Sequence, residues 1–257
     1  MPTDVTCSCI MMGSLGVTER GQDMDGLYAT NFLLFTAMGV SEKSCKEAIV
    51  NAAMDRAFRD ASSHVLSIDG GNEPKRKEGK GAISEALEKL EPFDDYAEWH
   101  DSLCQKLRDN DYSPGNEHPL KAITYGIAQK WVNMTMKYLA IAYYAFNEHE
   151  SCKDYCDFYE RVVKHHEADL HVPVDRYIIE AAWRKSSDIK LPVNDPGKRT
   201  NEYKHPADYC TAWSKWNEED YKQFQKTLRG ALGREDALDW EGSAWIEAAD
   251  HSSSQNH

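Results

Sequence analysis

Two residues stand out as able to carry chemistry. Lys130 lies in "GIAQKWVNMTMKYL", where apolar and aromatic residues follow it, and Asp175 ends the apolar loop "HVPVD" (171–175). A lysine in apolar surroundings can lose its charge and act as a nucleophile. A carboxylate against apolar walls has a shifted pKa and can stabilise a cation or take a proton. Each also has a structural interpretation: Lys130 as a surface lysine on a helix, and Asp175 as the N-cap of the next helix.

A glycine stands four residues before the lysine. The stretch "AITYGIAQKWVNMTMKYL" can be interpreted as a short helix, a tight turn at "GIAQ" and a long helix. Such a hairpin exposes backbone N–H groups at the start of its second helix, and these can hold a phosphate without a net positive charge. The alternative is one continuous buried helix that tolerates Gly126.

Composition indicates a soluble globular protein with an acidic surface. The 257 residues are 41% hydrophobic and 28% charged, with a formal net charge of −13. This charge disfavours non-specific attraction to nucleic acid, so a nucleic-acid role would need a local basic patch. The stretches 74–80 and 196–205 are locally basic. The sequence has seven scattered cysteines, which is typical of free thiols in a reducing compartment. It shows no signal-peptide pattern and no membrane-spanning run, so we expect a cytoplasmic protein without a membrane partner.

The apolar pattern predicts an all-α protein. Apolar residues recur at spacings of three and four and do not alternate as in a strand. We expect an N-terminal helical region (1–68), a polar linker (69–81), a helical domain (82–249) and a disordered tail (250–257). Asn217 is the expected N-cap of one late helix.

The two motifs together resemble the helix-hairpin-helix DNA glycosylases of base-excision repair. In that superfamily a G-h-G-x-K hairpin (h apolar) carries the catalytic lysine of the bifunctional members, and a "VPVD"-like loop carries the catalytic aspartate. Gly126 matches the first hairpin glycine, Lys130 the lysine and Asp175 the aspartate. Ala128 replaces the second glycine. The lysine and aspartate are 45 positions apart, about twice the usual spacing, so we expect an inserted helix to loop out, as in the archaeal 8-oxoguanine glycosylases. The resemblance covers roughly 118–186.

The resemblance implies a glycosylase-like helical bundle with its helix-hairpin-helix at 118–147 and its catalytic loop at 171–175. Lys130 would attack the sugar of a flipped nucleotide, and Asp175 would stabilise the cation-like sugar. The implied partner is DNA, bound by a monomer, and the implied substrate is an oxidised purine or a modified cytosine, the latter in defence against phage. Lyase activity is left open. No metal is expected, and the implied cofactor is at most a monovalent cation at the hairpin. Expected DNA contacts are Gly126, Ala128, Gln129, Lys198 and Arg199, and the expected base pocket is Trp131, Trp183 and Trp213.

Other patterns support different functions. "RDASSH" (Arg59–His64) and "RVVKHH" (Arg161–His166) fit the R-x4-H signature of the helical HEPN ribonucleases, which act as dimers. Cys152 and Cys156 resemble a zinc half-site without the remaining ligand spacing. A helical interaction protein without enzymatic activity is the third alternative. A glycosylase must bring Lys130 and Asp175 within several ångströms of each other in one cleft.

Overall fold

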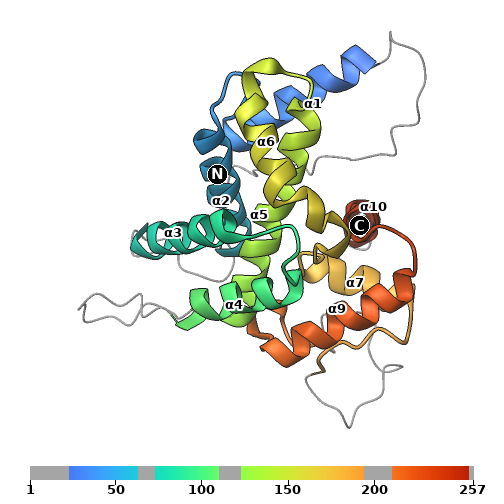
Figure 1. Cartoon of the computed structure of the whole chain (residues 1–257). Coiled ribbons are helices and arrows are strands. Elements are labelled where there is room, and N and C mark those ends of the chain that lie inside the picture. The colour runs from blue at the N-terminus through green and yellow to red at the C-terminus, as the bar shows by residue number, and fades with distance from the viewer. Residues whose placement is uncertain (1–22, 63–72, 110–122, 194–209, 255–257) are drawn as a thin grey trace, which may run out of the picture.

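The computed structural model describes residues 23–62, 73–109, 123–193 and 210–254 (Figure 1). Within these ranges the chain is helical and contains no β-strand, apart from an isolated bridge between Val193 and Cys210, so the predicted all-α class is confirmed. The α-helices are α1 (Asp23–Met38), α2 (Lys46–Ser62), α3 (Glu73–Lys89), α4 (Tyr96–Asp109), α5 (Tyr125–Phe146), α6 (Lys153–Val162), α7 (Arg176–Lys185), α9 (Glu218–Leu232) and α10 (Ala237–Ser254). Short 3-10 helices are η2 (Glu150–Cys152), η3 (Lys164–Asp169) and η5 (Trp213–Lys215).

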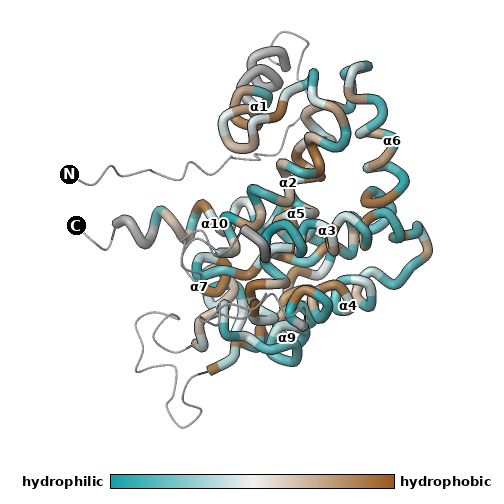
Figure 2. The backbone as a smooth tube through the Cα atoms, turned by 90° about the vertical axis from the view of Figure 1, so that its left-hand side faces the viewer, coloured by the Kyte–Doolittle hydropathy of each residue, from teal (hydrophilic) through white to brown (hydrophobic). Residues whose placement is uncertain are grey.

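Helix α5 is the centre of the fold. Most of its residues are buried, including the polar residues Gln129, Lys130 and Asn133, as expected for a helix that other helices enclose. Helices α2, α4 and α6 pack against it (Figure 1), and hydrophilic segments predominate along the outer helices α3 and α9 (Figure 2). One hydrophobic core runs from Leu34 in α1 to Ala244 in α10. Described residues of both predicted regions, 1–68 and 82–249, contribute to this core.

The predicted linker 69–81 is wrong from Glu73 onward, because α3 begins there. Gly79 explains how a polar stretch becomes a packed helix. A Cβ atom at this position would lie 2.2 Å from the ring of Trp131 in α5. The missing side chain therefore lets α3 lie directly on the core, and tertiary packing overrides the low helix propensity of glycine.

Two predictions near the C-terminus have different outcomes. Asn217 caps α9 as expected, and its side chain and that of Asp220 form a reciprocal capping box. The predicted disordered tail is wrong in part, because α10 continues to Ser254. Residues 255–257 lie outside the described part of the chain.

The chain between Lys130 and Asp175 travels out along α5 and returns. Sixteen residues of α5 follow Lys130, which at ~1.5 Å per residue is a path of roughly 24 Å. Helix α6, packed against α5, and then η3 bring the chain back to the loop before α7. The helix expected in this inserted segment is present as α6.

Candidate active site

The start of α5 is fixed by the segment that contains η5. Thr124 is the N-cap, and its side-chain oxygen accepts a hydrogen bond from the backbone N–H of Ile127 at 3.2 Å. The Gly126 N–H donates to the backbone carbonyl of Trp216 at 3.1 Å. A Cβ atom on Gly126 would lie 2.1 Å from the backbone oxygen of Trp213. Gly126 therefore permits η5 to lie against the first turn of α5.

Of the two alternatives for 126–129, the tight turn is wrong and the buried helix is present, because these residues lie at the start of α5. Gly126, Ala128 and Gln129 are buried. The Gly126 N–H is bonded within the chain, and the Gln129 side chain donates to the Gly126 carbonyl at 2.8 Å. These three residues are therefore unavailable for the expected DNA contact in this conformation. The other two expected DNA contacts, Lys198 and Arg199, lie outside the described residues.

Lys130 lies one turn after Gly126, on the face of α5 that meets η5. Its side chain is 10% exposed. The ammonium nitrogen is 4.7 Å from the centroid of the Trp213 ring and 3.2 Å from Oδ2 of Asp175. The expected proximity of Lys130 and Asp175 is therefore confirmed. A charge on such a buried lysine depends on the aromatic face and the carboxylate beside it.

The apolar loop before Asp175 is anchored in the core. Val172 and Val174 are fully buried. The Gln225 side chain, on α9, donates to the Val172 carbonyl at 2.7 Å and accepts from the Val172 N–H at 3.3 Å. These contacts satisfy the backbone of a segment without regular structure. The loop is therefore held in place, and it fixes the position of Asp175 at its end.

Asp175 is the N-cap of α7, as its structural interpretation predicted. Oδ1 accepts hydrogen bonds from the backbone N–H groups of Tyr177 at 2.9 Å and Ile178 at 3.0 Å. Oδ2 lies 3.2 Å from the Lys130 nitrogen and accepts from the Trp245 indole at 3.1 Å. The capping and pairing roles are thus divided between the two oxygens and are compatible.

These donors decide the charge of the carboxyl group. Burial is the largest single influence on the pKa of Asp175 and would raise it. The charge of Lys130 and the donated hydrogen bonds together outweigh burial, so the pKa is lowered from its ordinary value of 3.8. Asp175 is therefore ionised at neutral pH and can stabilise a neighbouring positive charge.

The expected base-pocket tryptophans are not gathered at one place. Trp131 is fully buried in the core, where its indole donates to the Met54 carbonyl at 3.0 Å. Trp183 is partly buried against the core, about two turns along α7 from Asp175. Trp213 contacts Lys130. Trp245 of α10 belongs to the site and was missed, because an indole on an amphipathic helix gives no local signal beyond core packing.

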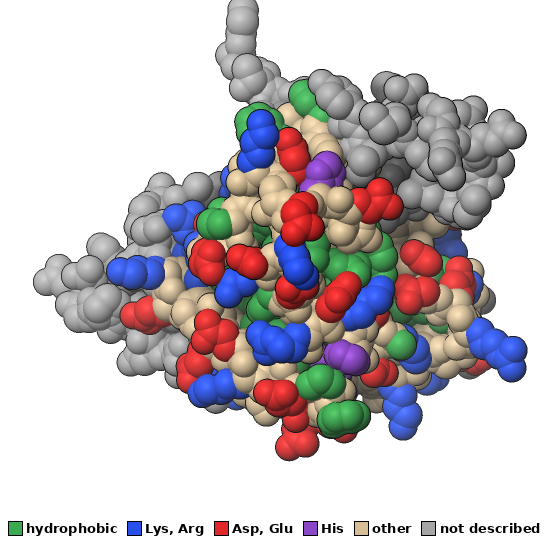
Figure 3. All heavy atoms as spheres, turned by 45° about the horizontal axis from the view of Figure 1, so that its top comes forward, with side chains coloured by type: hydrophobic (Ala, Val, Ile, Leu, Met, Phe, Trp, Pro, Cys, Tyr) green, Lys and Arg blue, Asp and Glu red, His purple; other side chains and the backbone are tan. Residues whose placement is uncertain are grey.

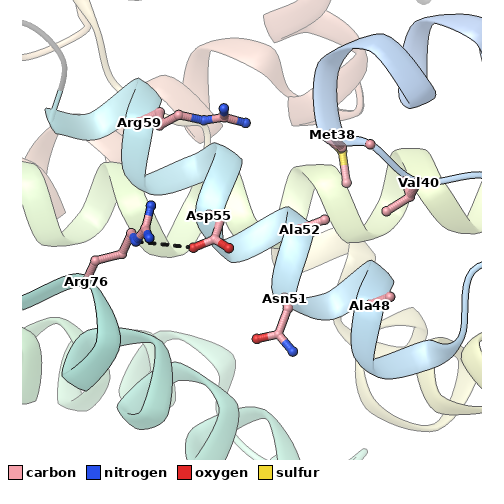
Figure 4. A pocket seen from close by; sticks show the side chains of 9 residues that line it. Met38, Val40, Ala48, Asn51, Ala52, Asp55, Arg59 and Arg76 are labelled. Carbon is pink, nitrogen blue, oxygen red and sulfur yellow. Dashed lines mark ion pairs between the residues drawn. The ribbon is translucent and has the colours of Figure 1, made fainter. Parts of the chain in front are cut away.

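Two cavities lie away from the pair, and neither is lined by Lys130 or Asp175. One, of about 430 Å³, lies between the end of α1, α2 and the start of α3, where Arg76 reaches toward Asp55 (Figure 4). The second, of about 350 Å³, continues it along α3. We call the two together the α2–α3 groove, with the polar lining Asn51, Asp55, Arg59, Arg76, Lys77, Lys80 and Ser84. The cleft expected around Lys130 and Asp175 is therefore not one of these two cavities.

The described residues that suggested the alternative functions make hydrogen bonds within the fold. His166 is 2% exposed, and its Nε2 lies 3.0 Å from the Glu91 carbonyl, so it does not present a catalytic imidazole to a dimer partner. Arg59 donates to the Ala37 carbonyl, and His64 lies outside the described residues. The thiol of Cys152 donates to the Glu42 carbonyl at 3.2 Å.

The described residues contain neither a group of metal ligands nor a membrane-spanning helix. Across those ranges, no three His, Cys, Asp or Glu side chains are grouped so as to hold a metal ion. No helix in the same part of the chain combines the length and apolar character needed to cross a membrane.

Comparison of the chain with models of known protein families, with curated proteins and with solved structures finds no match. The interpretation of the Lys130–Asp175 site therefore rests on its residues and their geometry.

Proposed function

We propose that this protein is a DNA glycosylase that uses Lys130 and Asp175 to excise a modified base. The observation that carries the proposal is the 3.2 Å contact between the Lys130 nitrogen and Asp175 Oδ2, formed across 45 residues of chain. A structural N-cap needs the two backbone donors that reach Oδ1, but it does not need a buried lysine on Oδ2. Burying such a pair is costly, and pairs of this kind cluster at sites of chemistry.

The proposed reaction begins when a flipped nucleotide enters the site. The Lys130 nitrogen forms a bond to C1′ of the sugar while the bond from C1′ to the base breaks, and the electron pair leaves with the base. Before this bond forms, Lys130 gives one ammonium proton to the departing base, because an ammonium nitrogen has no electron pair for attack and the lowered pKa of Asp175 makes its carboxylate a poor acceptor. Asp175 remains ionised and stabilises the positive charge on the sugar. The C1′–O4′ bond of the sugar then breaks, a second proton passes from the Lys130 nitrogen to O4′, and a C=N bond forms between C1′ and that nitrogen, which gives the Schiff base.

Trp213 is the proposed stacking residue for the base. Its ring lies beside the Lys130 ammonium in the resting protein. When Lys130 moves toward C1′, that face of the indole becomes available to a planar base, and stacking is worth roughly 1–3 kcal/mol per base. The substrate would thereby replace the cation on the aromatic face.

Binding of DNA by this acidic chain requires a local group of cations. Acidic and basic side chains are intermixed on the face shown in Figure 3. The α2–α3 groove instead contains the cations Arg59, Arg76, Lys77 and Lys80 with one lining carboxylate, Asp55. We propose that this groove supplies contacts to the phosphate backbone, away from the reacting nucleotide.

The test is release of the base from duplexes that each carry one modified base. Suitable bases are an oxidised purine such as 8-oxoguanine and a modified cytosine such as 5-hydroxymethylcytosine. We expect the wild-type protein to release at least one of these bases, and we expect Lys130→Met and Asp175→Asn to lose this activity.

Lys80→Met is the matched control. It removes a lysine that also pairs with an aspartate, since Lys80 lies 2.8 Å from Asp55 in the α2–α3 groove. It should retain turnover at saturating DNA. If Lys130→Met also retains turnover and Asp175→Asn does not, Lys130 is not the nucleophile. If the wild-type protein releases no base from any duplex, the proposed function is wrong.

A further inference from the structure

Trp245 contacts the same carboxylate oxygen as Lys130. Its indole nitrogen is 3.1 Å from Asp175 Oδ2, and the Lys130 nitrogen is 3.2 Å from that atom. Trp245 lies on α10, 70 positions after Asp175 in the chain. Three separate helices therefore meet at this oxygen: α5, α7 and α10.

We propose that Trp245 is the positioning residue of Asp175, and that its indole N–H holds Oδ2 in place when Lys130 moves to the substrate. This inference rests on the proposed function. A neutral N–H is suited to the role because it neither titrates nor forms a bond with the sugar. The hydrogen bond therefore persists through a reaction in which the ammonium leaves the carboxylate.

The partner of this indole differs from that of other tryptophans in the described chain. The indoles of Trp99, Trp131 and Trp216 each donate to a backbone carbonyl, which satisfies a partly or fully buried N–H. Trp245 instead donates to an ionised side chain, and hydrogen bonds to charged groups are about twice as strong as neutral ones. Simple satisfaction of a buried donor does not require a carboxylate.

The position of the indole is fixed by its neighbours. The ring of Tyr177, at the start of α7, packs edge-on against Trp245 with centroids 4.6 Å apart. One turn before Trp245 on α10, Glu241 forms an ion pair with Lys137 of α5. Lys137 lies two turns after Lys130, so α10 is held along the helix that carries the nucleophile. Helices α7 and α10 also pack together.

The test uses Trp245→Phe, which keeps an aromatic ring beside Tyr177 and removes the N–H donor. Loss of this hydrogen bond should raise the pKa of Asp175, because the bond favours the ionised form. We therefore expect the acidic limb of the pH–rate profile for base release to move to higher pH. The maximal rate should fall roughly 10- to 100-fold, the range for one hydrogen bond to a charged group.

Trp99→Phe is the matched control, because it also removes an indole donor, in this case to the Ala86 carbonyl. Its acidic limb should coincide with that of the wild-type protein. If the limb of Trp245→Phe also coincides with it, Trp245 is a packing residue and the inference is wrong.

A second measurement needs neither activity nor a tryptophan variant. In protein labelled with ¹⁵N, the indole N–H signal of Trp245 should move upfield in Asp175→Asn, because an amide oxygen is a weaker acceptor than a carboxylate. An unmoved signal overturns the inference. If the wild-type protein releases no base from DNA, the proposed function fails, and this spectrum still decides whether the indole holds Asp175.

Discussion

Two regions of the molecule place an aspartate beside a lysine, and they differ in what surrounds the pair. In the α2–α3 groove, Asp55 pairs with Lys80 and Arg76 beside an open cavity, and its side chain is 34% exposed. At the other site Asp175 and Lys130 lie mostly inside the protein, with side chains 18% and 10% exposed. The open cavity thus lies beside charges that are partly exposed to water. Around the buried pair of Lys130 and Asp175, protein groups take the place of water.

The two carboxylates also differ in the groups that contact them. Asp175 has a backbone cap on one oxygen and both a cation and an indole on the other. Its orientation is fixed before a substrate arrives, which is the condition for electrostatic stabilisation of a transition state. Asp55 is held by the long, partly exposed side chains of Lys80 and Arg76.

The largest effect is expected from Asp175→Asn. Asparagine can still cap α7, so the helix should form, but the charge beside Lys130 is lost. Base release should fall about 100- to 1,000-fold, as for removal of an electrostatic stabiliser. The free energy of unfolding should fall by about 3 kcal/mol, since a buried lysine is left without its partner. Kinetics and urea unfolding measure both, and retained turnover would remove Asp175 from the mechanism.

Two glycine substitutions should separate the regions. Gly126→Ala places a Cβ atom against the Trp213 carbonyl, so η5 must shift and Trp213 should move away from Lys130. Gly79→Ala forces α3 away from Trp131. Each should cost about 1–3 kcal/mol of stability, but below the melting temperature only Gly126→Ala should slow base release.

Gly242→Ala in α10 is the control for these substitutions, because nothing lies within 4 Å of its added Cβ. It should stabilise the protein by up to about 1 kcal/mol. Thermal melting and base-release rates measure the series. Equal slowing by Gly79→Ala and Gly126→Ala would contradict the separation of the two regions.

A smaller effect is expected from acid. Because the pKa of Asp175 is lowered in the folded protein from 3.8, its ionised form stabilises the fold above that pH, and this stability is lost as the pH falls through the lowered value. The difference in unfolding free energy between the wild type and Asp175→Asn should therefore be constant near neutral pH and shrink below pH 3.8. Urea unfolding from about pH 7 to pH 3 measures it. A difference that grows on acidification would mean that the folded protein does not favour the ionised form of Asp175.

The smallest effect is expected from Asp55→Asn in the α2–α3 groove. A partly exposed ion pair contributes about 1 kcal/mol or less, so the melting curve should change little. Turnover at saturating DNA should be unchanged, while DNA affinity at low salt should rise because a negative charge is removed from the groove. A loss of turnover as large as that of Asp175→Asn would contradict the proposed difference between the two regions.

The sequence predicted which residues meet at the site better than it predicted the local structure around those residues. Asp175 follows an apolar loop and precedes a helix, so its capping role is a local property that the sequence contains. Its contact with Lys130 was inferred from two short motifs. The sequence leaves a turn and a buried helix open at Gly126, because a glycine suits a turn as well as a close approach. The segment that requires this glycine, η5, lies almost ninety residues later.

Other errors have the same non-local origin. The polar stretch before Gly79 resembles a linker, and only the Trp131 ring, on another helix, makes it part of a packed layer. Trp245 reaches Asp175 because α10 packs on α7. Neither contact leaves a periodic or compositional pattern in the sequence near the residue concerned.

The most direct test of the central claim is borohydride trapping followed by peptide mapping. The protein is incubated with a duplex carrying a modified base that it releases, the Schiff base is reduced, and the cross-linked peptide is identified by mass spectrometry. We predict a covalent adduct on Lys130 in the wild-type protein and none in Lys130→Met, with Lys80→Met trapped as efficiently as the wild type at saturating DNA. An adduct on a different residue, or base release without any trapped adduct, would contradict the role of Lys130 as the nucleophile beside Asp175.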